Sequence, residues 1–87
     1  MAEYRLRLKS SAAKEIDAVD SKSDRRRIVE KIGALRADPR PHGCEKLSGY
    51  EDRYRLRQGN YRIVYLVDDA GRELTVFKIG HRKDVYK

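Results

Sequence analysis

The chain has 87 residues, of which 39% are hydrophobic and 40% are charged. At this length a chain buries only about 60–65% of its unfolded surface, so we expect one domain with one modest core. No apolar run approaches the roughly 20 residues of a membrane-crossing helix, and the first residues lack a signal-peptide core. The lone Cys44 excludes an internal disulfide, and no Cys/His cluster has zinc spacing. These features predict a single cytoplasmic domain over residues 1–87, without a metal or another cofactor.

The charge balance favours a polyanionic partner. Lys and Arg number 21 against 14 Asp and Glu, which gives a net charge of +7. Arginine supplies 13 of these cations, and its flat guanidinium suits bidentate contact with phosphate and stacking on bases. Small, basic, arginine-rich domains are typical of proteins that bind nucleic acid or an acidic protein. Charge alone leaves open the simpler alternative that a basic surface only keeps the chain soluble.

The first elements are expected to be a strand and a helix. Residues 4–8 alternate strictly, which predicts a strand that buries Tyr4, Leu6 and Leu8 on one face. Ser10 or Ser11 can cap the helix that follows. The apolar stripe of that helix consists of Ala12, Ala13, Ile16 and Val19.

A second helix is expected from Asp24 to Ala37. Ser21 followed by Asp24 resembles a weak capping box at its start. Pro39 ends the helix, because the residue before a proline avoids the helical region. A short polar turn joins the two helices, which predicts an antiparallel hairpin. The predicted core face of this helix consists of Ile28, Val29, Ile32 and Leu35.

The second half of the chain has the sequence pattern of β-strands. Residues 39–50 are expected to form a loop, with Leu47 as an anchor into the core. Strands are expected at residues 53–57, 61–67 and 73–79, joined by tight turns and ended by Gly80. The predicted fold class is α+β in the order β-α-α-β-β-β. It consists of an N-terminal strand, a two-helix hairpin and a three-stranded antiparallel meander in one small sheet.

Basic residues on the C-terminal strands form the candidate site. Arg55 and Arg57 lie two apart on one strand and point the same way, and Arg62 lies across the ladder from Arg57. Arg62 shares its face with apolar neighbours, so it occupies a position where an apolar residue is expected. Several arginines on one surface suit a phosphodiester, because they stabilise the extra charge of a pentacoordinate phosphorus without a metal. The simpler alternative is that Arg53, Arg55 and Arg57 are only the solvated face of an amphipathic strand.

Two motifs resemble those of a known family. The first is Gly59-Asn60-Tyr61-Arg62-Ile63-Val64-Tyr65, preceded by Tyr54-Arg55-Leu56-Arg57, and the second is Gly80-His81-Arg82-Lys83-Asp84-Val85-Tyr86. With the chain length and the element order, they resemble the RelE family, the small toxins of bacterial and archaeal type II toxin–antitoxin modules within the RelE/ParE superfamily. The resemblance covers nearly the whole chain and implies a helix hairpin on a small antiparallel sheet.

The resemblance also implies an activity. Members are endoribonucleases that enter the ribosomal A site and cut mRNA there, through attack of the 2′-hydroxyl on the adjacent phosphate and without a metal. Arg62 matches the arginine that holds the scissile phosphate, and Arg82 matches the arginine that stabilises the transition state or the leaving group. Tyr86 matches the tyrosine that stacks on the mRNA base and helps to orient or activate the 2′-hydroxyl.

The chain departs from the family pattern at two basic positions. Arg55 and Arg57 stand where the best-studied members have lysines, and a lysine can release a proton whereas an arginine effectively cannot. Both arginines remain candidates for phosphate binding, and proton transfer then falls to His81 or Tyr86. Histidine titrates near neutral pH and is the better chemical candidate. Two further cations are expected to bind RNA: Arg53 and Lys83.

The partners that the resemblance implies are a cognate acidic antitoxin, the ribosome with its 16S rRNA, and mRNA. Operator DNA would be bound only indirectly, through the antitoxin, and no membrane is involved. Two alternatives stay open. A ParE-like toxin would inhibit DNA gyrase and have no nuclease activity, although such relatives usually lack the full set of Arg62, Arg82 and Tyr86. A catalytically inactive member would only bind the antitoxin.

Overall fold

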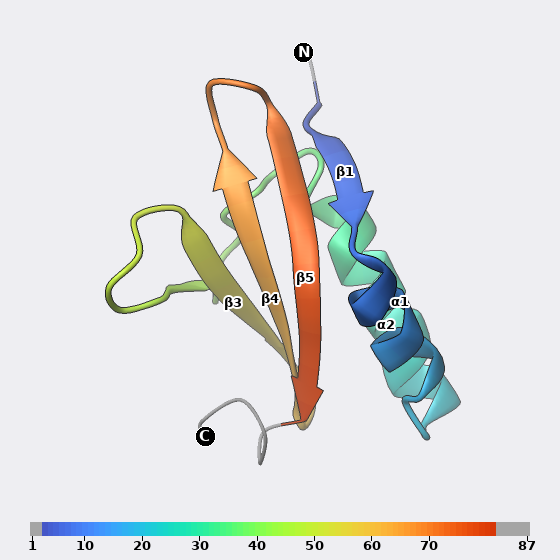
Figure 1. Cartoon of the computed structure of the whole chain (residues 1–87). Helices are drawn as coiled ribbons and strands as arrows, with labels where there is room; N and C mark the ends of the chain where they lie inside the picture. The colour runs from blue at the N-terminus through green and yellow to red at the C-terminus, as the bar shows by residue number, and fades with distance from the viewer. Residues whose placement is uncertain (1–2, 82–87) are drawn as a thin grey trace.

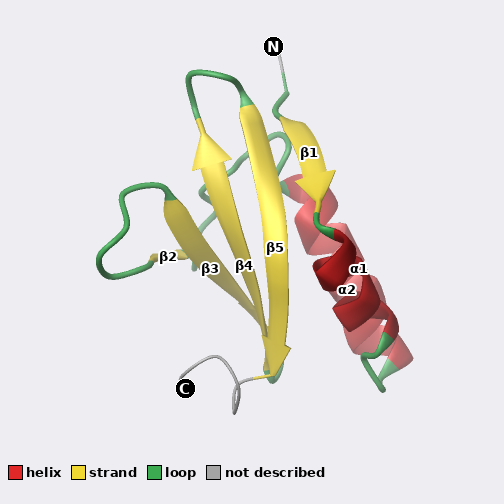
Figure 2. Cartoon of the chain, in the orientation of Figure 1, coloured by secondary structure: helices red, strands yellow, loops and turns green. Residues whose placement is uncertain are grey.

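The computed structural model describes residues 3–81, which form two helices on one side of a single sheet (Figures 1 and 2). In chain order the elements are β1 (Arg5–Leu8), α1 (Ser10–Asp17), α2 (Lys22–Ala34), β2 (Glu45–Lys46), β3 (Arg53–Gln58), β4 (Tyr61–Asp68) and β5 (Glu73–His81). The strands lie across the sheet in the order β1-β5-β4-β3-β2. No helix in this part of the chain is both long enough and apolar enough to span a membrane.

The predicted α+β class is confirmed, but the sheet is five-stranded and mixed. The meander of β3, β4 and β5 is antiparallel, as predicted. β1 lies parallel to β5 at one edge of the sheet, with Leu6 opposite Leu74, and the chain passes through the two helices to β2 at the other edge. β2 pairs with β3 inside the segment that was predicted as loop. That prediction was wrong because two residues are too few to show an alternating pattern.

The apolar face of the sheet packs against α1 and α2. Ile63, Tyr65 and Leu74 are fully buried on this face, and Ile28 of α2 and its C-cap residue Leu35 are fully buried against them. Full burial of such a side chain contributes about 1.5–3 kcal/mol. The opposite face of the sheet is therefore the one left without helices, and it bears the arginines of β3.

The ends of the helices differ in part from the prediction. The Ser21 hydroxyl accepts a hydrogen bond from the Asp24 N–H at 3.2 Å, which confirms the predicted cap of α2. α2 starts at Lys22 and ends at Ala34, three residues earlier than predicted, and the chain continues as a turn towards Pro39. The predicted serine cap of α1 was wrong: Lys9 occupies the N-cap position, and no side chain caps the helix.

Two apolar residues predicted on core faces are largely exposed. Val29 is 53% exposed and Leu8 is 43% exposed. Val29 directly follows the buried Ile28 in α2, and consecutive residues of a helix point about 100° apart. Leu8 is the last residue of an edge strand, where few neighbours cover it.

β5 contains a bulge, and it runs further than predicted. Tyr65 pairs with Val76 whereas Val64 pairs with Lys78, so Phe77 is an extra residue in β5. The strand continues through Gly80 to His81, because β4 still offers paired residues there. The prediction that Gly80 ends the strand was therefore wrong.

A polar cluster at one end of the sheet joins distant parts of the chain, and we call Tyr4, Arg40, Tyr54 and Asp69 the Asp69 cluster. Arg40 donates to both carboxylate oxygens of Asp69, at 2.7 and 3.2 Å, and its Nε donates to the Tyr54 hydroxyl at 2.9 Å. The Tyr4 hydroxyl donates to the same carboxylate. These bonds, with Arg40 first and Tyr4 second, hold the pKa of Asp69 below its ordinary value. The cluster fixes the loop after α2 against the β4–β5 turn.

Candidate functional site

Four arginines gather on the sheet face that lies away from the helices, and we call this the arginine face. The alternation of β3 places Arg53, Arg55 and Arg57 on it, while Tyr54, Leu56 and Gln58 point to the helices. Arg62 of β4 lies directly opposite Arg57, as the sequence predicted. Like charges opposite each other in a ladder are destabilising. Such a pair is therefore expected where an anion is to be bound.

Arg57 and Arg62 are held in different ways. Arg57 is exposed, and its Nε donates to the Gly59 carbonyl at 3.1 Å. Arg62 is only 8% exposed, and its Nη1 donates to the Tyr61 carbonyl at 3.3 Å. On its other side Arg62 pairs with Gly80, which has no side chain. The Arg62 side chain is therefore buried in the sheet, whereas its neighbour Arg57 is exposed.

The β3–β4 turn beside these arginines is fixed from the helix side. The Gln58 amide lies 3.5 Å from a carboxylate oxygen of Asp24 in α2, and Lys31 donates to the Arg57 carbonyl at 2.9 Å. Gly59 has a φ of +59°, in the left-handed region that favours glycine. The backbone that presents Arg57 and Arg62 is thus attached to α2 at two points.

Arg55 and Arg53 extend the arginine face along β3. The Nε of Arg55 lies 3.4 Å from a carboxylate oxygen of Glu45 in β2, a weak and partly solvated pair. The guanidinium of Arg53 lies 4.3 Å from the ring centroid of Tyr50 and 5.4 Å from that of Phe77. Rings rather than a carboxylate therefore hold Arg53 in place.

His81 lies on the other side of the sheet. It pairs with Tyr61, and the two rings meet edge to face with their centroids 5.4 Å apart. Tyr61 in turn pairs with Gln58, which points to α2, and Tyr61 packs against the apolar core. The structure therefore brings Arg62 and Arg57 together but places the His81 ring on the face away from them.

A scan against family models matches residues 6–86 to the ParE toxin of the type II toxin–antitoxin system parDE. The match covers nearly the whole chain. The chain belongs to the RelE/ParE superfamily of type II toxins. No curated protein sequence matches this toxin.

Solved structures similar to this toxin include several of RelE proteins. An archaeal RelE–RelB complex from Pyrococcus horikoshii matches with a TM-score of 0.82 and 28% identity, covering 94% of this chain and 98% of that one. The isolated RelE toxin of E. coli matches with a TM-score of 0.77 and 29% identity, covering 95% of this chain and 90% of that one. The intact E. coli RelBE toxin–antitoxin complex matches with a TM-score of 0.74 and 30% identity, covering 90% of this chain and 95% of that one. The family model, described as ParE, and these three structures, described as RelE, thus agree on the superfamily.

The remaining predicted site residues of the toxin fall outside the described part. Arg82, Lys83 and Tyr86 lie beyond residue 81, so their roles stay predictions. Among residues 3–81 no group of three or more His, Cys, Asp or Glu side chains is placed to hold a metal ion.

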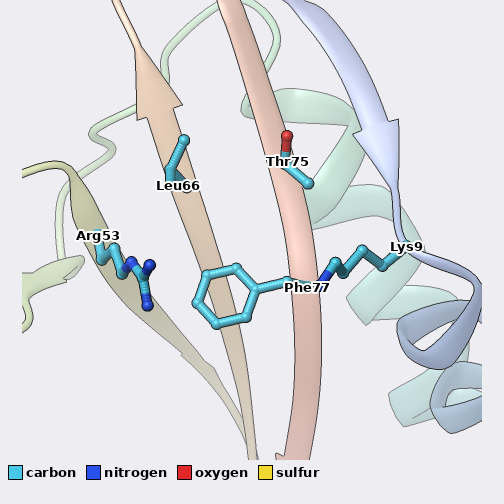
Figure 3. Close-up of a pocket in the computed structure, with 5 residues that line it drawn as sticks. All are labelled: Lys9, Arg53, Leu66, Thr75 and Phe77. Carbon is cyan, nitrogen blue, oxygen red and sulfur yellow. The ribbon is translucent and has the colours of Figure 1, made fainter.

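Sequence reasoning predicted Arg53 as an RNA-binding residue but missed the other members of a second group on the arginine face. Lys9, Arg53, Leu66, Thr75 and Phe77 line a depression of about 230 Å³ (Figure 3). One signal was present in the sequence: the core residues Val76 and Ile79 are three positions apart, which breaks the alternation of β5 and indicates a bulge. Phe77 is the extra residue of that bulge, and its ring centroid lies 5.4 Å from the Arg53 guanidinium.

Proposed function

We propose that this toxin is a ribosome-dependent endoribonuclease that cuts mRNA in the A site and thereby inhibits translation. The observation that supports this most directly is the Arg57–Arg62 pair, two like charges facing each other across the ladder on the arginine face. Their mutual repulsion falls when an anion lies between them, and a phosphodiester is such an anion. The motif resemblance and the RelE structures at 28–30% identity favour RNA as its source.

The chemistry needs charge stabilisation and two proton transfers. The 2′-oxygen attacks the adjacent phosphorus while the bond to the 5′-oxygen breaks, which leaves a 2′,3′-cyclic phosphate and a 5′-hydroxyl. The proton of the 2′-hydroxyl must leave, and the 5′-oxygen must gain one. In the proposed site Arg62 and Arg57 bind the non-bridging oxygens, where negative charge increases in the transition state. Arg82 is proposed to stabilise the leaving group.

The placement of His81 affects the proposed proton transfers. Its ring packs on Tyr61, on the face away from Arg62. Of the two candidates from the sequence, we therefore favour Tyr86 as the group that activates or orients the 2′-hydroxyl. His81 is proposed as a positioning residue that acts through its contact with Tyr61.

The proposed partners follow from the relatives. Structures of RelE from Pyrococcus horikoshii, Methanococcus jannaschii and E. coli, at 26–30% identity, are described as complexes with RelB. We propose a cognate acidic antitoxin for this toxin as well, since the net charge of +7 complements an acidic chain. The ribosome and mRNA are the proposed targets, and operator DNA is bound only through the antitoxin.

The proposal is tested by primer extension on a defined mRNA in a purified translation system. We expect a discrete cut within the A-site codon only when ribosomes are present, and no cut of naked RNA in EDTA. Arg62→Gln and Arg82→Ala should each lower the cleavage rate by at least about 100-fold, as expected for loss of a transition-state donor. Arg27→Gln removes the same charge from an exposed position of α2 and serves as the control. Full cleavage by both site variants would refute the assignment.

The ParE description of the matching family model supports a second candidate, a gyrase-inhibiting toxin. A supercoiling assay separates the two. Inhibition of supercoiling by the toxin, with no cleavage of ribosome-bound mRNA, would replace the nuclease by the gyrase inhibitor. A protein that does neither but binds an antitoxin would be the inactive member.

A further inference from the structure

We infer that the depression lined by Lys9, Arg53, Leu66, Thr75 and Phe77 is a subsite for an unpaired nucleobase of single-stranded RNA. The inference rests on the proposed nuclease function and assigns a second contact to the same substrate. We call this site the Phe77 subsite. It is separate from the position of the scissile phosphate at Arg57 and Arg62.

The lining combines the surfaces that a nucleotide needs. Phe77 and Leu66 supply an apolar wall on which the flat face of a base can stack. The Thr75 hydroxyl can donate to or accept from a base edge. Lys9 and Arg53 bring two cations for the adjoining phosphate, and Figure 3 shows both side chains directed to the Phe77 ring. Among residues 3–81, no carboxylate lines the depression.

Aromatic rings contact the Arg53 guanidinium, and no ion pair within residues 3–81 includes it. Its Nε is buried and has no hydrogen-bond partner in the described part of the chain, and its guanidinium lies between the Tyr50 and Phe77 rings. No ion pair within residues 3–81 includes Arg53 or Lys9. Both charges are therefore available to a phosphate, whereas Arg55 already has Glu45 beside it.

The size and the position of the depression limit its occupant. Pockets for drug-sized ligands measure about 300–1,000 Å³, so about 230 Å³ has room for one ring system and not for a larger cofactor. Leu66 is four residues along β4 from Arg62, which corresponds to about 13 Å. A strand stacked as in a duplex crosses that distance in about four nucleotides, and an extended strand in fewer. The arginines of β3 line the path between the two points.

An acidic side chain of an antitoxin is the other class of occupant. It would pair with Lys9 and Arg53 but would make no use of the Phe77 ring or of Leu66. A base with its phosphate uses every group in the lining. The observations therefore favour RNA, and the peptide becomes an outcome of the test.

The test measures binding, not cleavage, so that it does not depend on the nuclease activity. The probe is a fluorescent single-stranded RNA with 2′-O-methyl groups, which cannot be cut, and its affinity is measured by fluorescence anisotropy. Matched probes contain one abasic position each. Phe77→Leu removes the aromatic face and Phe77→Tyr keeps it, and circular dichroism checks that both are folded. Lys9→Gln is compared with Lys14→Gln, an exposed lysine of α1.

We expect Phe77→Leu to weaken binding of the intact probe by about tenfold, and Phe77→Tyr to leave it nearly unchanged. At one probe position, removing the base should cost the wild type the same factor and should cost Phe77→Leu nothing more. Lys9→Gln should reduce the slope of log affinity against log salt by about 0.7, whereas Lys14→Gln should not.

The outcomes separate the subsite from the nuclease. Base-dependent binding that needs Phe77, in a protein that cuts no mRNA, would support the subsite while the proposed function fails. Cleavage of ribosome-bound mRNA with equal affinities for wild type and Phe77→Leu would overturn the subsite and leave the nuclease standing. Loss of binding to an acidic peptide, but not to RNA, in Lys9→Gln would assign the depression to a protein partner and would also overturn the inference.

Discussion

The placement of His81 makes a strong prediction about the reaction. A side chain that transfers a proton in the transition state contributes roughly 100- to 10,000-fold to the rate. The His81 ring packs edge to face on Tyr61 on the helix side of the sheet, and Arg62 lies on the other side. We therefore expect His81→Gln to lower single-turnover cleavage in the A site by less than about tenfold.

The same substitution should have a measurable effect on stability. An aromatic edge-to-face contact is worth about 0.5–1.5 kcal/mol beyond the area it buries. For a domain of this size about 1 kcal/mol lowers Tm by roughly 4–8 °C. His81→Gln should thus show a lower Tm with a nearly normal rate, and His42→Gln, at an exposed loop position, should show neither change.

A pH profile of single-turnover cleavage decides the question. If His81 is the proton acceptor, the pH profile of the wild type shows an inflection that depends on the His81 side chain. His81→Gln would then lose that inflection and at least about 100-fold in rate. This result would refute the assignment of His81 as a positioning residue and would require its side chain to reach the arginine face.

Three further predictions concern the fold and the anion site. Tyr65→Phe removes the hydrogen bond of 2.8 Å from a fully buried hydroxyl to the Pro39 carbonyl, so it should cost about 1 kcal/mol or more in thermal unfolding, and an unchanged Tm would contradict that role. Arg40 holds the pKa of Asp69 low, so the stability it adds is present above about pH 4 and is lost as the pH falls through the folded pKa. Asp69→Asn should therefore lower Tm at pH 7 but not at the acid end of a pH series, and a constant difference would refute this. Arg57→Gln removes one of two like charges that lie opposite each other, so it should raise Tm in low salt. It should also abolish the extra stabilisation that binding of sulfate to the pair gives the wild type. Equal increases in Tm with sulfate for both proteins would show that the pair binds no anion.

The sequence predicts those parts of the fold whose patterns repeat along several residues. The alternation in β3 and β4 fixed which residues share a face, and hence that Arg57 meets Arg62. The Ser21 cap and the helix stripes were also predictable, because capping and periodicity are local. The position of β1 beside β5 was not, since a parallel pairing depends on contacts between residues nearly 70 positions apart rather than on either strand alone.

Short and irregular features could not be predicted from the hydrophobic pattern of the sequence. β2 has two residues, and its pairing depends on the course of a loop. The Asp69 cluster joins the N-terminus, a loop and a hairpin turn, and no spacing in the sequence links these three places. The Phe77 subsite joins Lys9, Arg53 and Phe77 from three distant places in the chain, and no sequence pattern links them.

His81 shows how one position in a strand changes a chemical interpretation. The sequence places it next to Arg82 and nineteen residues from Arg62, and as an imidazole it is the natural proton acceptor. Strand geometry adds the missing constraint: Gly80 lies opposite Arg62, so the next residue in β5 must point to the other face as long as the strand continues. If Gly80 had ended the strand, as the sequence suggested, His81 would be free to turn towards the arginines. The two residues by which β5 exceeds its predicted length, Gly80 and His81, therefore keep the histidine away from the phosphate site. This is why proton transfer is proposed for Tyr86.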